Sequence, residues 1–183
     1  MSLVELSERP FELLVELERR VRTSLAGRQD GTDEAHERVG VGFRLGAESF
    51  VAPREEVREV LPVPDSVTRV PGAKPWLKGI ANVRGHLLPV VDLRAFLGGG
   101  ITLPDRSTRI LVASERDVPS GLLVDEVVGF RRFSTGDYEA QSPATLIRCE
   151  NYLDGSYRRG DENWPVFCLK KLLEDEQFLS AAE

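Results

Sequence analysis

The sequence has few cysteines, no long apolar run and no cluster of basic residues, and each shortage excludes a class of protein. Its two cysteines, Cys149 and Cys168, lie far from any metal-binding spacing, so reduced thiols are the simplest interpretation. No segment reaches the roughly 18 consecutive apolar residues of a membrane span, and residues 1–10 lack the apolar core of a secretory signal. These shortages predict a cytoplasmic protein that does not insert into a membrane.

Charge and motif content argue against nucleic-acid binding and against catalysis. The net charge is −6, and the Lys and Arg residues are scattered among acids, whereas nucleic acid or anionic lipid requires a concentrated basic face. The serine-hydrolase, zinc-protease and phosphate-loop motifs are absent, and the two histidines, His36 and His86, lie in different segments. Asp92 and Asp125 are explained by cap and hairpin roles. We therefore predict no catalytic residue, no metal ligand, no cofactor and no nucleic-acid partner.

The N-terminal region has the pattern of an amphipathic helix followed by a linker. Pro10 suits a first helical turn, where a missing N–H has no cost. Four apolar residues recur at helical spacing and form one stripe: Phe11, Leu14, Val21 and Leu25. We predict a helix within residues 1–27 and a polar linker over residues 28–38. The apolar stripe either packs on the rest of the chain, which is the commoner outcome and the one favoured, or binds a partner.

From residue 39 the hydrophobic period changes to strict alternation, which predicts strands. Four apolar residues alternate with small or polar ones: Val39, Val41, Phe43 and Leu45. Residues 50–52 return as a second strand, and residues 57–63 form a third. Residues 80–91 predict a tight hairpin around Gly85, which is free to take positive φ. Asp92 then caps a short helix.

The second half repeats this theme weakly, which suggests two related lobes. Strands are expected at residues 110–113 and 121–130, followed by a loop over residues 134–150 that crosses between the lobes. Residues 151–169 form a last hairpin, and residues 170–182 a terminal helix whose apolar side includes Leu169, Leu172, Leu173 and Leu179. Many short strands with frequent turns favour barrels or a sandwich over a parallel α/β sheet.

Residues 78–93 carry a motif that resembles the signature of the CheW family: a glycine, then Asn-x-Arg-Gly, then Pro-Val-x-Asp-Leu. Three further segments match: residues 43–46, 57–60 and 121–127. The resemblance covers about residues 39–173. It implies a mainly β fold of two SH3-like five-stranded β-barrels around a shared hydrophobic core, with the predicted helices added at both ends. The CheW-like domain is expected to span residues 39–176, with two intertwined barrels and a tail at residues 177–183.

The resemblance also implies partners. CheW-type proteins bind the regulatory domain of a CheA-type histidine kinase and the cytoplasmic tip of a chemoreceptor, and they act as scaffolds without catalysis. Residues 9–14, 50–53, 76–79 and 164–167 further resemble the branch of the family that serves type IV pilus (twitching motility) signalling. The alternative within the family is a flagellar chemotaxis protein.

Four residues are predicted to bind the receptor on the strength of this resemblance. Arg84 matches the arginine of the Asn-x-Arg-Gly motif, and a guanidinium at a hairpin tip can reach a carboxylate through two hydrogen bonds. Its alternative is an internal ion pair of little energetic value. Val57 and Glu59 match the receptor-facing groove, where an exposed Val57 beside Val60 would accept a receptor side chain. The alternative is a core valine and a solvated glutamate. Asn82 is included mainly because it can orient the hairpin.

A competing hypothesis is a small acidic β-barrel that binds peptides and has no link to chemotaxis. In that case Trp76, Trp164 and Tyr157 would gather along one groove. An enzyme with a hidden site ranks third. The kinase-binding residues are not predicted individually, although the hairpins at residues 39–52 and 110–124 are plausible candidates.

Overall fold

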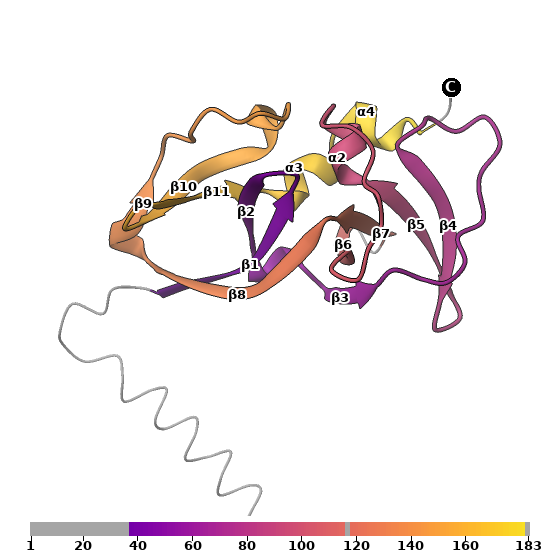
Figure 1. Cartoon of the computed structure of the whole chain (residues 1–183), viewed down its shortest axis with the longest axis horizontal. Coiled ribbons are helices and arrows are strands. Elements are labelled where there is room, and N and C mark those ends of the chain that lie inside the picture. Colours follow the sequence, from indigo (N-terminus) through magenta and orange to yellow (C-terminus); the bar gives the residue numbers. More distant parts are fainter. Residues whose placement is uncertain (1–36, 116–117, 182–183) are drawn as a thin grey trace, which may run out of the picture. The chain divides into compact units, whose positions relative to one another are not determined.

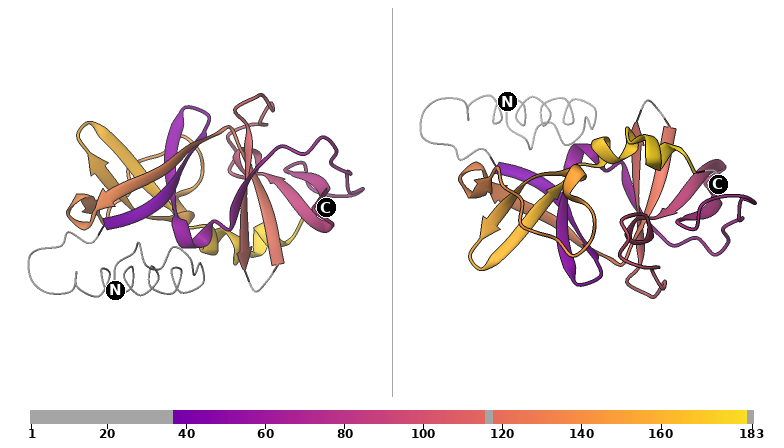
Figure 2. Two further views of the ribbon diagram at one scale, coloured as in Figure 1. Left: turned by 90° about the horizontal axis from the view of Figure 1, so that it is seen from below. Right: turned by 90° about the horizontal axis from the view of Figure 1, so that it is seen from above.

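The computed structural model describes residues 37–115 and 118–181. They fold into two mostly antiparallel sheets that lie side by side (Figures 1 and 2). The helix predicted within residues 1–27 and most of the predicted linker lie outside the described residues. Glu37 and Arg38, placed in that linker, already belong to the first strand. No helix among the described residues is both long and apolar enough to cross a membrane. The predicted mainly β fold of two lobes is confirmed.

The first sheet has six strands in the order β8-β1-β2-β11-β10-β9. Its members are β1 (Glu37–Leu45), β2 (Glu48–Pro53), β8 (Glu126–Ser134), β9 (Tyr138–Glu139), β10 (Leu153–Arg159) and β11 (Glu162–Phe167). The strand predicted at β1 is confirmed, and Val41, Phe43 and Leu45 are at most 3% exposed. Burial does not alternate as expected, because Gly40 and Gly42 between them are buried too. β9 has only two residues, so this sheet is the expected five-stranded barrel with a short sixth strand added.

The second sheet has five strands in the order β3-β6-β7-β5-β4. Its members are β3 (Glu59–Pro62), β4 (Leu77–Val83), β5 (His86–Asp92), β6 (Arg109–Glu115) and β7 (Val118–Val124). Short α2 (Leu93–Phe96) follows β5, and the predicted cap is confirmed because the Asp92 side chain accepts a hydrogen bond from the Ala95 N–H. The edge strands β3 and β4 are joined by the extended loop of residues 63–76.

The chain passes between the two sheets at two short connections. The first is the 3₁₀ turn η1 (Arg54–Glu56) between β2 and β3, and the second is Asp125 between β7 and β8. The prediction that residues 134–150 cross between the lobes is wrong. That segment leaves β8 through η2 (Thr135–Asp137) and returns through η3 (Glu150–Tyr152) to β10, so it begins and ends in the six-stranded sheet.

The largest apolar core lies between the sheets, as the family resemblance implied. Both sheets and the C-terminal region contribute fully buried side chains to it, including Phe43, Phe50, Phe167, Leu93, Leu111, Leu122, Leu169 and Leu172. The rings of Phe43, Phe50 and Phe167 pack mutually with centroids 5.7–5.9 Å apart. Each sheet also has one smaller apolar cluster of its own. The first lies in the five-stranded sheet and the second in the six-stranded sheet. The shared core therefore fixes one lobe against the other.

The C-terminal segment forms two short helices instead of the single one predicted. α3 (Leu169–Leu173) ends at Glu174, and Asp175 caps a new helix, α4 (Glu176–Leu179), by accepting hydrogen bonds from the Gln177 and Phe178 N–H groups. Leu179, predicted to be on the apolar side, is 66% exposed, and Phe178 is buried in its place. The break rotates the second helix so that a different residue faces the core.

Glu56 of η1 holds the start of α3 from 113 residues away in the sequence. Its Oε2 accepts hydrogen bonds from the Leu169 N–H at 2.5 Å and the Lys170 N–H at 3.2 Å. An anionic acceptor at a helix start satisfies otherwise unpaired N–H groups and complements their partial positive charge. We expect Glu56→Gln to lower the free energy of unfolding by about 1 kcal/mol. Urea denaturation measures this, with the neighbouring exposed Glu55→Gln as the control; equal effects of both would refute the capping role.

Candidate binding site

The β4–β5 hairpin turns through only two residues, Arg84 and Gly85, and both have positive φ, at 51° and 84°. Two successive positive φ values match the twist of the flanking strands, which is why such loops favour glycine and asparagine. Asn82 supports the turn, because its Oδ1 accepts a hydrogen bond from the Gly85 N–H at 2.9 Å. The positive φ expected of Gly85 is confirmed, whereas that of Arg84 was not predicted.

Arg84 projects from this tip with 74% of its side chain exposed, and it forms an ion pair with Glu59, Nη1 to Oε2 at 3.0 Å. Glu59 lies on β3, so the pair joins the hairpin to the opposite edge of the five-stranded sheet. Exposed pairs of this kind typically contribute about 0–1 kcal/mol, because water already solvates both charges. The guanidinium therefore keeps most of its surface available to a partner.

Val57 is not at the surface, and of the two interpretations drawn from the sequence the structure has the core valine. It is 3% exposed and packs in the core between the sheets, in the extended stretch that links η1 to β3. Val60, three residues on, is 40% exposed. Predicting an exposed Val57 was therefore wrong, and Val60 is the valine that a partner can reach beside Glu59.

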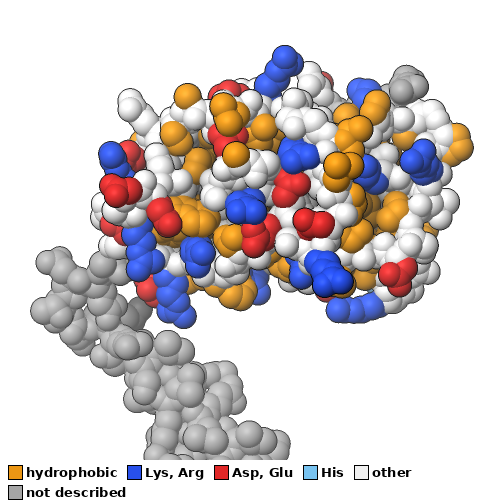
Figure 3. Space-filling model, in the orientation of Figure 1, with side chains coloured by type: hydrophobic (Ala, Val, Ile, Leu, Met, Phe, Trp, Pro, Cys, Tyr) orange, Lys and Arg blue, Asp and Glu red, His pale blue; other side chains and the backbone are white. Residues whose placement is uncertain are grey.

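A second exposed apolar side chain lies on the hairpin itself. Leu87 is 69% exposed and is the direct cross-strand partner of Asn82. Sequence reasoning missed it, because it stands in an apolar run, residues 87–91, that indicates a strand buried on both faces. It lies in the second residue pair below the turn, near the end of the hairpin. Over the face drawn in Figure 3, acidic, basic and apolar side chains are interspersed and not separated by sign.

The base of the hairpin is fixed by a buried carboxylate. Asp92, at the end of β5, is fully buried. Besides capping α2, it accepts hydrogen bonds from the N–H and hydroxyl of Thr102, both at 2.9 Å, and lies 3.6 Å from the Lys78 ammonium on β4. The cap was predicted, but the other contacts connect residues far apart in the sequence. They hold β4, β5 and the loop after α2 together.

Two observations concern thiol and metal chemistry in the described residues. Burial raises the pKa of the Cys149 thiol to about 11, and burial also raises the pKa of Cys168. Both thiols therefore stay protonated at neutral pH and lack the thiolate that a nucleophile needs. Within residues 37–115 and 118–181, no three His, Cys, Asp or Glu side chains gather closely enough to hold a metal ion.

The aromatic groove required by the peptide-binding hypothesis does not form. Trp76 packs against Phe96 and Phe178, with ring centroids at 5.2 and 6.0 Å, beside the core between the sheets. Trp164 and Tyr157 belong to the separate cluster inside the six-stranded sheet. The three side chains that were expected to share one groove therefore lie in two different clusters.

Two β-sheets around a shared core, with an exposed arginine on a rigid two-residue turn, define a binding module of the paired-barrel scaffold class. The CheW-like domain family matches residues 39–177, and the chain belongs to this family. It is 39% identical to protein PilI of Pseudomonas aeruginosa, over 94% of this chain and 96% of PilI. It is 25% identical to the chemotaxis protein CheW of Helicobacter pylori, over 87% of this chain and 94% of that protein.

A solved structure agrees with this assignment. The scaffolding protein TtCheW from Thermoanaerobacter tengcongensis superposes with a TM-score of 0.66 at 28% sequence identity. The match covers 76% of this chain and 94% of TtCheW. The predicted resemblance to the CheW family, and within it to PilI-type adaptors, is confirmed.

Proposed function

We propose that this chain is a non-catalytic cytoplasmic adaptor that couples a methyl-accepting chemoreceptor to a CheA-type histidine kinase in type IV pilus signalling. The observation that carries the proposal is the 39% identity to PilI, which extends over 94% of this chain and so beyond the CheW-like domain at residues 39–177. The 25% identity to a chemotaxis CheW is lower. A flagellar role is therefore the second candidate within the family.

The receptor-binding surface in this proposal is the tip of the β4–β5 hairpin and the adjacent edge of β3. Arg84 supplies the charged contact, and its positive φ supports the assignment, because strained backbone tends to persist where function requires it. Glu59 orients the guanidinium, and Asn82 sets the turn. Val60 and Leu87 provide the apolar area that Val57 cannot.

Signalling by such an adaptor relies on differential affinity and not on bond chemistry. A receptor conformation that binds the adaptor better shifts the kinase between its own states through the shared complex, and the coupling is reciprocal. Each contact can be weak, because many linked copies raise the effective concentration of every partner. An exposed, rigid tip is suited to this task, since little conformational entropy is lost on binding.

Reconstitution from purified components tests the proposal. We expect the chain to bind a kinase regulatory domain and a receptor-tip fragment from the same genome separately, with dissociation constants on the order of micromolar. A kinase pulldown should retain the receptor fragment only when the chain is present. Components of the pilus system should bind more tightly than their flagellar counterparts. Absence of kinase binding would favour an unrelated peptide-binding module, and preference for flagellar partners would reassign the pathway.

A further inference from the structure

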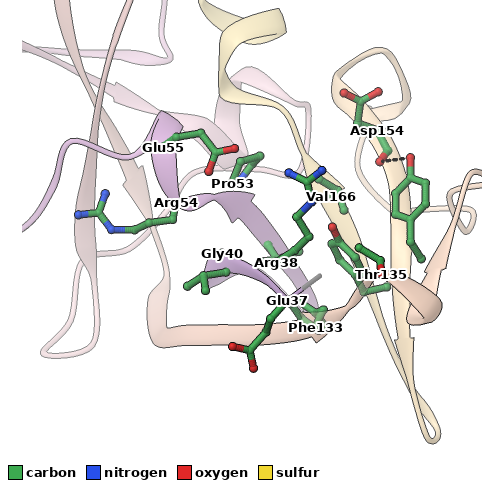
Figure 4. A pocket seen from close by; sticks show the side chains of 14 residues that line it. Glu37, Arg38, Gly40, Pro53, Arg54, Glu55, Phe133, Thr135, Asp154 and Val166 are labelled. Carbon is green, nitrogen blue, oxygen red and sulfur yellow. Dashed lines mark hydrogen bonds between the residues drawn. The ribbon is translucent and has the colours of Figure 1, made fainter. Parts of the chain in front are cut away.

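A pocket of about 540 Å³ opens at one end of the six-stranded sheet (Figure 4), and none of its lining residues belongs to the β4–β5 hairpin. Its volume lies within the range of about 300–1,000 Å³ that is usual for small-molecule sites. Apolar side chains of four strands form the inner wall: Val39, Val51, Phe133 and Val166. Tyr157 stacks on Phe133 with ring centroids 4.5 Å apart and an interplanar angle of 9°, which gives the wall a flat aromatic surface.

One arginine and one phenol in this pocket have donors that the described residues do not use. The Arg38 guanidinium reaches into the middle of the pocket in Figure 4, and no described acid lies within ion-pair distance of it. The Tyr157 hydroxyl donates to no described acceptor, and burial raises the pKa of Tyr157, so it remains a donor at neutral pH. Arg38 is exposed, so among the described residues both donors are accessible to an acceptor that enters the pocket.

Most acidic side chains on the rim of the pocket form ion pairs with basic residues. This determines whether a ligand beside Arg38 should be an anion or a cation. Glu37 pairs with Arg132 at 3.0 Å, and Asp154 pairs with Lys171 at 3.0 Å. Glu55 is the remaining rim acid, exposed at the mouth of the pocket. An anion is therefore favoured beside Arg38 and a cation only at the outer edge.

We propose that this pocket binds a carboxylate carried on an aromatic or branched aliphatic group. The carboxylate accepts two parallel hydrogen bonds from Arg38 and one from Tyr157, while the apolar body lies on the Phe133–Tyr157 stack and against Val51. The same chemistry is offered by a free aromatic acid and by a peptide that ends in an aromatic residue. The site would give the adaptor a ligand-dependent input separate from its receptor-binding tip.

The probe is 3-phenylpropionate, titrated into the full chain and followed by amide chemical shifts. We expect saturable shifts at residues lining the pocket, with a dissociation constant on the order of 1 mM for so small a ligand. Arg38→Gln should weaken binding about tenfold or more. Arg158→Gln, on β10 and paired with Glu139 outside the pocket lining, is the matched control and should leave the affinity for 3-phenylpropionate unchanged.

Two further titrations decide between outcomes. Phenethylamine, which keeps the ring but replaces the acid by an amine, should not bind; equal or tighter binding would overturn the proposal in favour of Glu55. A tripeptide ending in phenylalanine distinguishes the sources: tighter binding than 3-phenylpropionate indicates a peptide terminus, and weaker binding a free acid. No saturable shift by either acid up to tens of millimolar, with the wild-type fold intact, would refute the site.

Discussion

Replacement of Arg84 by glutamate should abolish binding to a receptor tip and leave the fold unchanged. The side chain is 74% exposed and its ion pair with Glu59 is a surface pair, so stability should change by less than about 1 kcal/mol. Binding should fall by about 100-fold or more, because the variant loses the donor and places a second negative charge beside Glu59. Surface plasmon resonance with an immobilised receptor fragment measures the loss.

Arg132→Glu is a closely matched control for this experiment. Arg132 is 70% exposed and pairs with Glu37 at the same 3.0 Å distance, but it lies on β8 of the other sheet. The two variants have equal net charge, so a general electrostatic effect would weaken both. Kinase binding by Arg84→Glu should be unaffected. A folded Arg84→Glu variant that still binds the receptor tip with wild-type affinity would refute the assigned surface.

Local patterns in the sequence were enough to predict the β4–β5 hairpin and the short helix that follows it. Gly85 required positive φ, and Asp92 preceded a helical segment, and both features depend on residues within a few positions of each other. The period-two pattern of β1 likewise indicated a strand whose Val41, Phe43 and Leu45 face the core between the sheets. Such features are predictable because the backbone geometry of a turn, cap or strand is set mainly by its own residues.

Features set by distant partners could not be predicted. Val57 lies beside a strand and not in it, so alternation did not reveal that it turns toward the core between the sheets. The pairing of Glu59 with Arg84 joins strands at opposite edges of one sheet, and no pattern specifies that order. Residues 134–150 contain a two-residue strand whose partners are chosen by tertiary packing, and composition alone suggested a crossing loop.

The same distinction explains the C-terminal region. Leucines at residues 169, 172, 173 and 179 fit one helical face, but Asp175 between them is a strong cap and begins a second helix. The Asp175 carboxylate also accepts a hydrogen bond from the Tyr152 hydroxyl at 2.9 Å, which fixes where the new helix starts. The Asp175 cap therefore ends the helical period of the leucines. Phe178 is buried at the position where Leu179 was expected.

Removal of the Asp92 side chain should have the largest effect on stability among these variants, about 3–5 kcal/mol for Asp92→Ala. The fully buried carboxylate serves four groups: the Ala95 N–H, the Thr102 N–H, the Thr102 hydroxyl and the Lys78 ammonium. Truncation leaves three of these donors without an acceptor in a site that water does not reach. Lys78 is less affected, because its side chain is 31% exposed and can be hydrated. Urea denaturation measures the loss.

Asp175→Ala compares a partly buried helix cap, which also accepts a hydrogen bond from the Tyr152 hydroxyl, with the buried network of Asp92. Asp175 caps α4 in a comparable way but is only partly buried, so we expect a loss of about 1–2 kcal/mol. Asp92→Asn should fall between the two alanine variants, since it keeps the shape and one acceptor oxygen but loses the charge that Lys78 and the N–H groups contact. Because Asp92 holds the base of the hairpin while Arg84 lies at its tip, folded Asp92→Asn protein should still bind the receptor. Equal losses for Asp92→Ala and Asp175→Ala would mean that Asp92 acts only as a cap.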